Sequence, residues 1–264
     1  LEILRERGVY VAGPAVGRQA CGTEGPGRLA DPAEILMMSA RAVRHPTDLR
    51  GKHVLISAGG HREPLDPVRF VGNASSGRMG WALAFAAWTR GARVTVIQGT
   101  SDVPPPPLVD MVPAATALAM RNAVMEYLPR CDIFISAAAV ADYRPDHPQP
   151  GKRKRSKEPW TITLVPNPDI LSEACQHRRT GQVLVGFAAE TEDTLARGME
   201  KRRDKGVDLL VANTVGGEHG AIGSDTADAW IIGPGDAVTP LLHADKLTIA
   251  DRLLDRCIAM CQGA

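Results

Sequence analysis

The polar stretch over residues 59–80 carries residue types that bind anions and stabilise developing negative charge. Small residues near its two ends would let a ligand approach the backbone closely, and these are Gly59, Gly60, Ser75, Ser76 and Gly77. Unpaired N–H groups in the first turn of a helix, together with the helix dipole, attract phosphate. Because a helix-like sequence follows Gly80, we expect this stretch to hold the phosphates of a ligand.

Three polar side chains in this stretch have both a chemical and a structural interpretation. Asn73 can donate a hydrogen bond to a developing oxyanion without repelling it, and an asparagine also suits a turn at positive φ. Arg62 and Arg69 can hold phosphate or carboxylate through two N–H groups at once. Salt bridges to Glu63 or Asp66 would explain the same arginines as anchors of the loop.

Three further segments fall where predicted strands end, namely residues 137–145 (AAAVADYRP), 186–191 (GFAAET) and 212–213. Ligands of parallel α/β sheets gather beyond the carboxyl ends of the strands, so we predict one composite pocket from these segments and 59–80. The alanines would expose backbone groups to a flat partner such as a nucleobase, and Asp142 would face a hydroxyl or a metal-bound water. Tight packing of a turn explains the alanines equally well.

Residues 151–157, GKRKRSK, place five cations in one loop flanked by prolines. A solvated surface run is the simpler interpretation. A nucleic-acid patch lacks the interleaved aromatic residues that such sites use. A lid that folds over a polyphosphate is the chemical alternative, and lysine suits that role as a point charge.

Short apolar runs alternate with helical patterns from His53 onward. Strands are expected over 53–58, 93–97, 132–136, 160–165, 182–187 and 208–213, and helices over 78–90, 115–127, 168–175 and 192–205. This alternation predicts an α/β fold with a Rossmann-like, mainly parallel sheet and helices on both faces. The runs AWIIG and TPLLH predict a C-terminal β-hairpin, and a final helix follows them.

Helix ends and loops can also be placed from the sequence. Asp31 and Asn167 each precede a proline, so both are expected to act as helix N-caps. The glycine-rich residues 17–31 are expected to form an irregular loop.

Composition excludes several classes of function. The 264 residues carry a net charge of +1 and 44% hydrophobic residues, so no global field recruits nucleic acid or an anionic membrane. No apolar run approaches the roughly 20 residues of a membrane helix, and no signal peptide is visible, so we expect a cytoplasmic protein. The five cysteines form no C-x-x-C pair, and the histidines form no metal motif. The chain begins with Leu1 rather than Met, and we expect it to be part of a longer protein.

Several long motifs stand in one order along residues 50–260: AGGHREPLDPVRFVGNASSGRMG, AAAVADYRP, KRKR, NPDI, VGFAAET and DLLVAN. Together they resemble the phosphopantothenoylcysteine synthetase half of the bifunctional coenzyme A biosynthesis proteins. The resemblance implies a ligase that joins 4′-phosphopantothenate to L-cysteine through an acyl-cytidylate, with CTP as the co-substrate and Mg²⁺ as the cofactor. It also implies a homodimer. The choice of CTP over ATP depends on this resemblance alone.

The resemblance assigns roles to individual positions. It implies that Asn73, Lys152 and Arg69 are catalytic. The positions that it implies for nucleotide and substrate binding are Gly59, Gly60, Ser75, Ser76, Gly77, Ala138, Ala139, Asp142, Lys154 and Phe187. Mg²⁺ would bind through the nucleotide phosphates, with Asp142 as a candidate contact. His61 and Pro166 depart from the family pattern, which has Thr and Lys there, and Pro166 removes a candidate phosphate contact.

The N-terminal segment GRQACGTEGPGRLADPAEIL resembles the end of the flavin-dependent decarboxylase that is fused to these ligases. Cys21 matches the proton donor of that enzyme's substrate loop. The decarboxylase's histidine and its Pro-x-Met-Asn segment are not found here, so FMN is expected only in a missing decarboxylase part. We therefore predict a decarboxylase remnant over 1–49 and a ligase domain over 50–264, without decarboxylation by this chain alone.

Two other functions remain open from the residues. One is an NAD(P)-dependent Rossmann oxidoreductase, although the strand RVTVIQG ends without the acidic residue that binds the adenosine ribose. The other is a non-catalytic partner module whose loop over 14–32 completes the active site of a flavoprotein decarboxylase.

Overall fold

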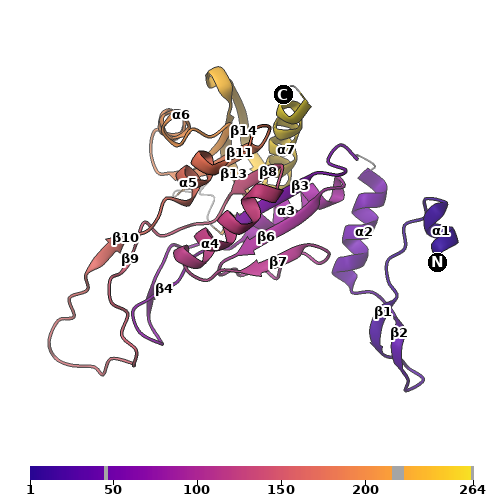
Figure 1. Cartoon of the computed structure of the whole chain (residues 1–264), viewed down its shortest axis with the longest axis horizontal. Coiled ribbons are helices and arrows are strands. Elements are labelled where there is room, and N and C mark those ends of the chain that lie inside the picture. The colour runs from indigo at the N-terminus through magenta and orange to yellow at the C-terminus, as the bar shows by residue number, and fades with distance from the viewer. Residues whose placement is uncertain (45–46, 216–222, 263–264) are drawn as a thin grey trace.

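The computed structural model describes residues 1–44, 47–215 and 223–262, and its centre is one eight-stranded sheet (Figure 1). The strands of this sheet are β3 (His53–Ala58), β6 (Arg93–Gln98), β7 (Asp110–Pro113), β8 (Ile133–Ser136), β11 (Val183–Glu190), β12 (Leu209–Thr214), β13 (Thr226–Ile232) and β14 (Val238–Asp245). Their order is β14-β13-β12-β11-β8-β3-β6-β7. All pairs from β12 to β7 are parallel, and β13 and β14 pair antiparallel at one edge.

Helices cover both faces of the sheet. The helices α2 (Pro32–Arg44), α3 (Arg78–Thr89) and α7 (Lys246–Gln262) share one core cluster, while α4 (Ala117–Tyr127), α5 (Ile170–His177) and α6 (Thr194–Lys205) pack on the other face. Strand residues alternate between these layers: Val54 and Ile56 face α3, and Leu55 faces α4 and α5. The predicted α/β architecture, with its C-terminal hairpin and helix, is therefore confirmed. Short elements complete the chain, namely α1 (Glu2–Glu6), η1 (Leu128–Arg130) and η2 (Pro234–Asp236).

Three expectations about local structure are wrong. The strand expected over 160–165 is instead β10 (Leu164–Pro166), which pairs antiparallel with β9 (Tyr143–Pro145) outside the main sheet. The glycine-rich segment expected as a loop contains the hairpin of β1 (Ala15–Arg18) and β2 (Glu24–Arg28). Asn167 is not an N-cap, because α5 begins at Ile170 and the Asp169 side chain accepts from Ser172 N–H. Proline and glycine in these segments obscure the usual strand and cap patterns.

The connection from β3 to α3 also folds locally. It contains β4 (Glu63–Pro64) and β5 (Phe70–Val71), which pair as a short hairpin. The far end of α3 is anchored by Arg90, a buried guanidinium bonded to Asp48 and Asp255. Helix α3 thus has one fixed end and presents its N-terminus at the carboxyl edge of the sheet. None of the described helices has both the length and the apolar character needed to cross a bilayer.

Candidate functional site

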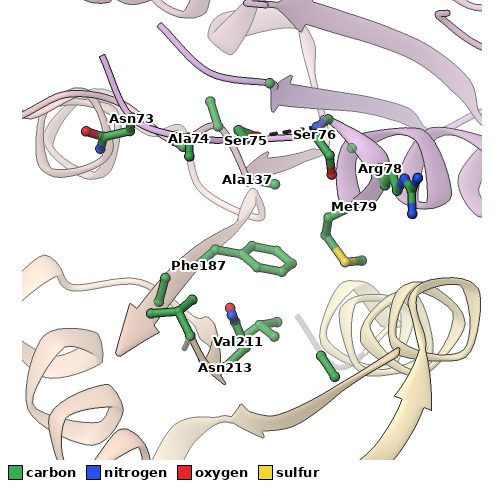
Figure 2. A pocket seen from close by; sticks show the side chains of 18 of the residues that line it. Asn73, Ala74, Ser75, Ser76, Arg78, Met79, Ala137, Phe187, Val211 and Asn213 are labelled. Atoms are coloured by element: carbon green, nitrogen blue, oxygen red, sulfur yellow. Dashed lines mark hydrogen bonds between the residues drawn. The ribbon is translucent and has the colours of Figure 1, made fainter. Parts of the chain in front are cut away.

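A cavity of about 360 Å³ opens beyond the carboxyl ends of β3, β8, β11 and β12 (Figure 2). All four segments that the sequence analysis placed at strand ends contribute residues to it. Glu190 and Thr191, at the end of the segment 186–191, are not among the described lining residues. The described lining residues from these segments are Gly59, Asn73 to Gly80, Ala137 to Val140, Asp142, Phe187, Ala189 and Asn213. The predicted convergence of distant segments on one pocket is confirmed. The volume lies in the range of small-molecule sites.

The N-terminus of α3 opens directly into this cavity. Gly77 is the N-cap with a φ of 74°, and no side chain caps the helix. The Trp81 N–H makes the first helical bond, to Gly77 O at 3.1 Å, so the N–H groups of Arg78, Met79 and Gly80 have no helical acceptor. A Cβ on Gly77 would lie 2.1 Å from Ser101 Oγ, so the turn requires glycine. This end can hold phosphate through backbone N–H groups and the helix dipole.

The opposite wall is built by the end of β8 and by β11. The N–H groups of Ala137 and Ala139 donate to Ser57 O at 3.0 Å and Gly59 O at 2.8 Å, which fixes the alanine segment beside the end of β3. The Phe187 ring and the Met79 thioether point toward the same central space in Figure 2. Small residues beside an aromatic ring make a flat, partly apolar slot that suits a planar ligand.

Two polar side chains stand at one end of the cavity. Asn73 Nδ2 donates to Val140 O at 3.0 Å, and in Figure 2 this amide points away from the Phe187 ring. Asp142 is exposed, and its carboxylate makes no hydrogen bond with any residue in the described ranges. Asn167, expected only as a cap, instead supports this end, since its N–H donates to Asp142 O at 2.7 Å and its Nδ2 to Ala141 O at 2.8 Å.

Among the described residues, three cations line the cavity, and sequence reasoning missed two of them. Arg78 at the start of α3 pairs with Asp225 at 2.7 Å. Lys201 on α6 lies 3.9 Å from a Glu190 oxygen. Lys246 begins α7, and burial lowers its pKa although the nearby Asp225 charge opposes this shift. No local motif marks Lys201 or Lys246, because helices that are distant in sequence bring them to the site.

Several predicted site residues are absent from the described lining of the cavity. Arg69 forms an ion pair with buried Asp66 at 2.8 Å, which matches its structural interpretation. Lys152 and Lys154 are exposed on the loop between β9 and β10. Gly60 pairs with Thr100 through two backbone hydrogen bonds beside the cavity.

Cys21 is also outside the cavity, at the exposed tip of the β1–β2 hairpin. A hydrogen bond with Thr23 lowers the pKa of its thiol.

His61 and Glu63 of the 59–80 connection are buried, whereas Arg62 is exposed and its guanidinium carbon lies 4.7 Å from the centre of the Phe70 ring. His61 is 1% exposed, neither ring nitrogen has a hydrogen-bond partner in the described chain, and burial lowers its pKa to about 4. Glu63 is 2% exposed, and its Oε1 accepts from Ala117 N–H at 2.7 Å at the start of α4. Within the described ranges, no three His, Cys, Asp or Glu side chains are grouped to hold a metal ion.

Comparisons with known proteins agree with the resemblance found in the sequence. A family model, the DNA/pantothenate metabolism flavoprotein C-terminal domain, matches residues 49–260. The coenzyme A biosynthesis bifunctional protein CoaBC of Mycolicibacterium smegmatis is 42% identical over 267 residues, which cover 96% of this chain and 64% of that protein. The protein of the same name from Escherichia coli is 41% identical over 251 residues, with coverages of 94% and 62%. The chain thus spans just under two thirds of these curated relatives.

A solved structure shares the fold. The crystal structure of the C-terminal domain of coenzyme A biosynthesis bifunctional protein CoaBC superposes with a TM-score of 0.70 at 32% identity. The match covers 83% of this chain and 100% of that one.

Proposed function

This chain belongs to the family of the DNA/pantothenate metabolism flavoprotein C-terminal domain, and we propose that it is a phosphopantothenate–cysteine ligase. The observation that carries the proposal is the uncapped N-terminus of α3, which opens into a cavity with three cations and an alanine and phenylalanine slot. Such a site suits a nucleoside triphosphate: the helix end and cations face the phosphates, and the slot faces the base. The names of the relatives support coenzyme A biosynthesis as its setting.

The proposed reaction has two steps. The carboxylate of 4′-phosphopantothenate attacks the α-phosphate of CTP, and pyrophosphate leaves with the bond electrons. The amine of L-cysteine then attacks the acyl carbon of the acyl-cytidylate, loses a proton and releases CMP as the amide forms. Both steps develop negative charge on oxygen and need positioned donors more than a protein nucleophile.

Each part of the cavity has a role in this reaction. The N–H groups of residues 78–80, with Lys201 and Lys246, hold and neutralise the polyphosphate. Ala138, Ala139 and Phe187 contact the cytosine through backbone groups and the ring face. Asn73 offers an uncharged amide near the acyl-phosphate oxygens, where a carboxylate would repel them.

Mg²⁺ is expected to enter with the nucleotide rather than on a protein cage. The ion shields the phosphate charges and prepares pyrophosphate as a leaving group. Asp142 fits as its protein contact, because this exposed carboxylate lines the cavity and has no partner among the described residues.

We also infer that the ligase domain, residues 50–264, works as a homodimer, with residues 1–49 belonging to an upstream decarboxylase part that would hold FMN. Four large apolar side chains are exposed on the two small hairpins, which suits contact with a second copy. These are Val68 at 59%, Phe70 at 50%, Tyr143 at 53% and Leu164 at 43% exposure.

The test incubates the purified chain with CTP, Mg²⁺, 4′-phosphopantothenate and L-cysteine. Pyrophosphate release that requires phosphopantothenate, and CMP release that requires cysteine, are the expected results, with CTP preferred over ATP. Lys201→Gln should raise the KM for CTP about fivefold, whereas Arg197→Gln, which removes a partner of the same Glu190 outside the cavity lining, should not. No pyrophosphate release with either nucleotide would contradict the proposed function.

A further inference from the structure

The two predicted catalytic cations that lie outside the cavity, Arg69 and Lys152, belong to segments that the structure ties together. Asp66, 3% exposed, lies where these segments meet. Its Oδ1 accepts from the N–H groups of Val68 and Arg69, each at 2.8 Å. Its Oδ2 accepts from the Arg69 guanidinium at 2.8 Å and from the backbone N–H of Arg153 at 3.3 Å. One carboxylate therefore joins the β4–β5 turn to the loop of residues 149–160, here called the basic loop.

Further contacts fix the basic loop at both of its ends. At the start of the loop, Gln149 N–H donates to Leu65 O at 2.8 Å. At its centre, Arg69 Nη2 donates to Arg153 O at 3.2 Å. At its end, the guanidinium carbons of Arg69 and Arg153 lie 5.5 Å and 4.8 Å from the centre of the Trp160 ring. Both distances fall within the range of cation–π attraction.

These contacts hold the basic loop against the β4–β5 turn, outside the cavity lining. Lys152 is the neighbour of the bonded Arg153, and no residue from 149 to 160 belongs to the described lining of the cavity. Figure 1 shows the connection between β9 and β10 projecting away from the main sheet, beside the loop that carries β4. Few contacts hold it, and Lys152, Arg153 and Lys154 are exposed. The free energy needed to release the loop is therefore small.

We propose that Asp66 and Trp160 are positioning residues, which dock the basic loop on the β4–β5 turn and hold Lys152 away from the cavity until a polyphosphate draws it in. The docking itself stands on the contacts above, and the role of the polyphosphate rests on the proposed function. Attraction between the cationic loop and the phosphates supplies the force for undocking. Arg69 Nη2, freed from the carbonyl of Arg153, would become available at the same moment, while Nη1 keeps its bond to Asp66.

The first test needs no ligand. A protease that cleaves after lysine is applied to the full chain, and cuts at Lys152, Lys154 and Lys157 are followed by mass spectrometry. Trp160→Leu keeps an apolar side chain but removes the π face, so cleavage should rise about two- to fivefold, because cleavage tracks the open population. Trp160→Phe keeps a π face and should be cut at the wild-type rate. Equal cleavage of the leucine variant and the wild type, with both folded by circular dichroism, would overturn the docking.

The second test measures binding of CTP–Mg²⁺ by calorimetry and steady-state turnover. Because docking competes with loop closure, Trp160→Leu should lower the dissociation constant and the KM for CTP about two- to fivefold, with kcat unchanged and Trp160→Phe at wild-type values. An increased or unchanged KM in the leucine variant would overturn the competition. If no variant binds CTP while the leucine variant is cleaved faster, the proposed function fails and the docking stands. If all variants bind CTP but are cleaved alike, the docking fails and the proposed function stands.

Discussion

The connection between β3 and α3 has two halves that differ in how their polar residues are placed. In the first half, His61, Glu63 and Asp66 are 1%, 2% and 3% exposed. In the second half, residues 73–77 line the cavity with one asparagine and four small residues. The first half packs these three side chains as scaffold, although Arg62 is exposed, and the half of small residues forms the candidate site. Charged residue types alone therefore do not locate a phosphate site, since accessible backbone N–H groups also bind anions.

The buried charges of the first half persist because each has partners. Glu63 caps the start of α4, whose other cap is Thr116, and Asp66 accepts four hydrogen bonds. Burial raises the pKa of the Asp66 carboxyl, but the hydrogen bonds and the Arg69 charge outweigh it and leave the pKa below its usual value. A buried carboxylate without such partners would be expelled or protonated.

The largest effect is expected in the open half. Asn73→Asp places a negative charge beside the acyl-phosphate oxygens, so ligase turnover should fall about 100-fold, or the activated intermediate should accumulate. Rapid-quench separation of acyl-cytidylate and product measures both. Asn122→Asp, at an exposed position of α4 outside the cavity lining, is the matched control and should leave turnover unchanged. Unchanged turnover in Asn73→Asp would mean that Asn73 has only a structural role, through its hydrogen bond with Val140.

The buried residues of the first half should instead affect the free energy of unfolding. His61 stays neutral in the folded chain because burial lowers its pKa to about 4, whereas an unfolded histidine titrates near 6.5. Below pH 6.5 the histidine binds a proton in the unfolded chain but not in the folded chain. The free energy of unfolding therefore falls as the pH drops from 6.5 toward 4. At pH 5 this amounts to about 2 kcal/mol.

His61→Thr removes this pH dependence. Urea unfolding at pH 7 and pH 5 should show the wild type losing about 2 kcal/mol more than the variant between the two pH values. An equal loss in both proteins would mean that His61 accepts a proton in the folded state. The His61 ring would then be accessible to solvent protons in the folded protein.

A third change tests whether the backbone of the open half is the binding element. Gly77→Ala brings a Cβ to 2.1 Å from Ser101 Oγ at a φ of 74° and should lower kcat/KM for CTP about tenfold. Gly206→Ala is a matched control, since Gly206 has a φ of 67° at the C-cap of α6 with open space around it. That variant should lose stability while its KM for CTP stays the same. Equal catalytic effects of both substitutions would argue against a special role for the α3 N-terminus.

The smallest effect is expected for Glu63→Gln. The amide keeps the shape of the cap but weakens its bond to Ala117 N–H, so unfolding free energy should fall by about 1 kcal/mol. Thermal denaturation measures this loss, and the KM for CTP should not change. A large loss of ligase activity at unchanged stability would end the division of the connection into scaffold and site.

Much of the fold was predictable because its signals are local. The apolar strands β3, β8 and β12 and the helix α3 were expected within two residues of their observed bounds, since hydrophobic runs and turn residues mark them directly. Strand β7 was missed and β10 was misplaced, because both are short, contain a proline and lie at edges. Asn167 precedes a proline, as an N-cap often does, yet its side chain donates to Ala141 O, 26 residues earlier in the sequence.

The sequence by itself determined the small, glycine-containing end of the 59–80 connection, the alanine segment and Phe187, because residue types and their order carry that information. Only the tertiary structure decided which charges serve the site. Lys201 and Lys246 reach the cavity on helices that pack against distant strands, while Arg69 and Lys152 lie outside its described lining, where Arg69 and Arg153 contact Asp66 and Trp160. The physical reason is that a charge acts through its distance and burial, and long-range packing sets both.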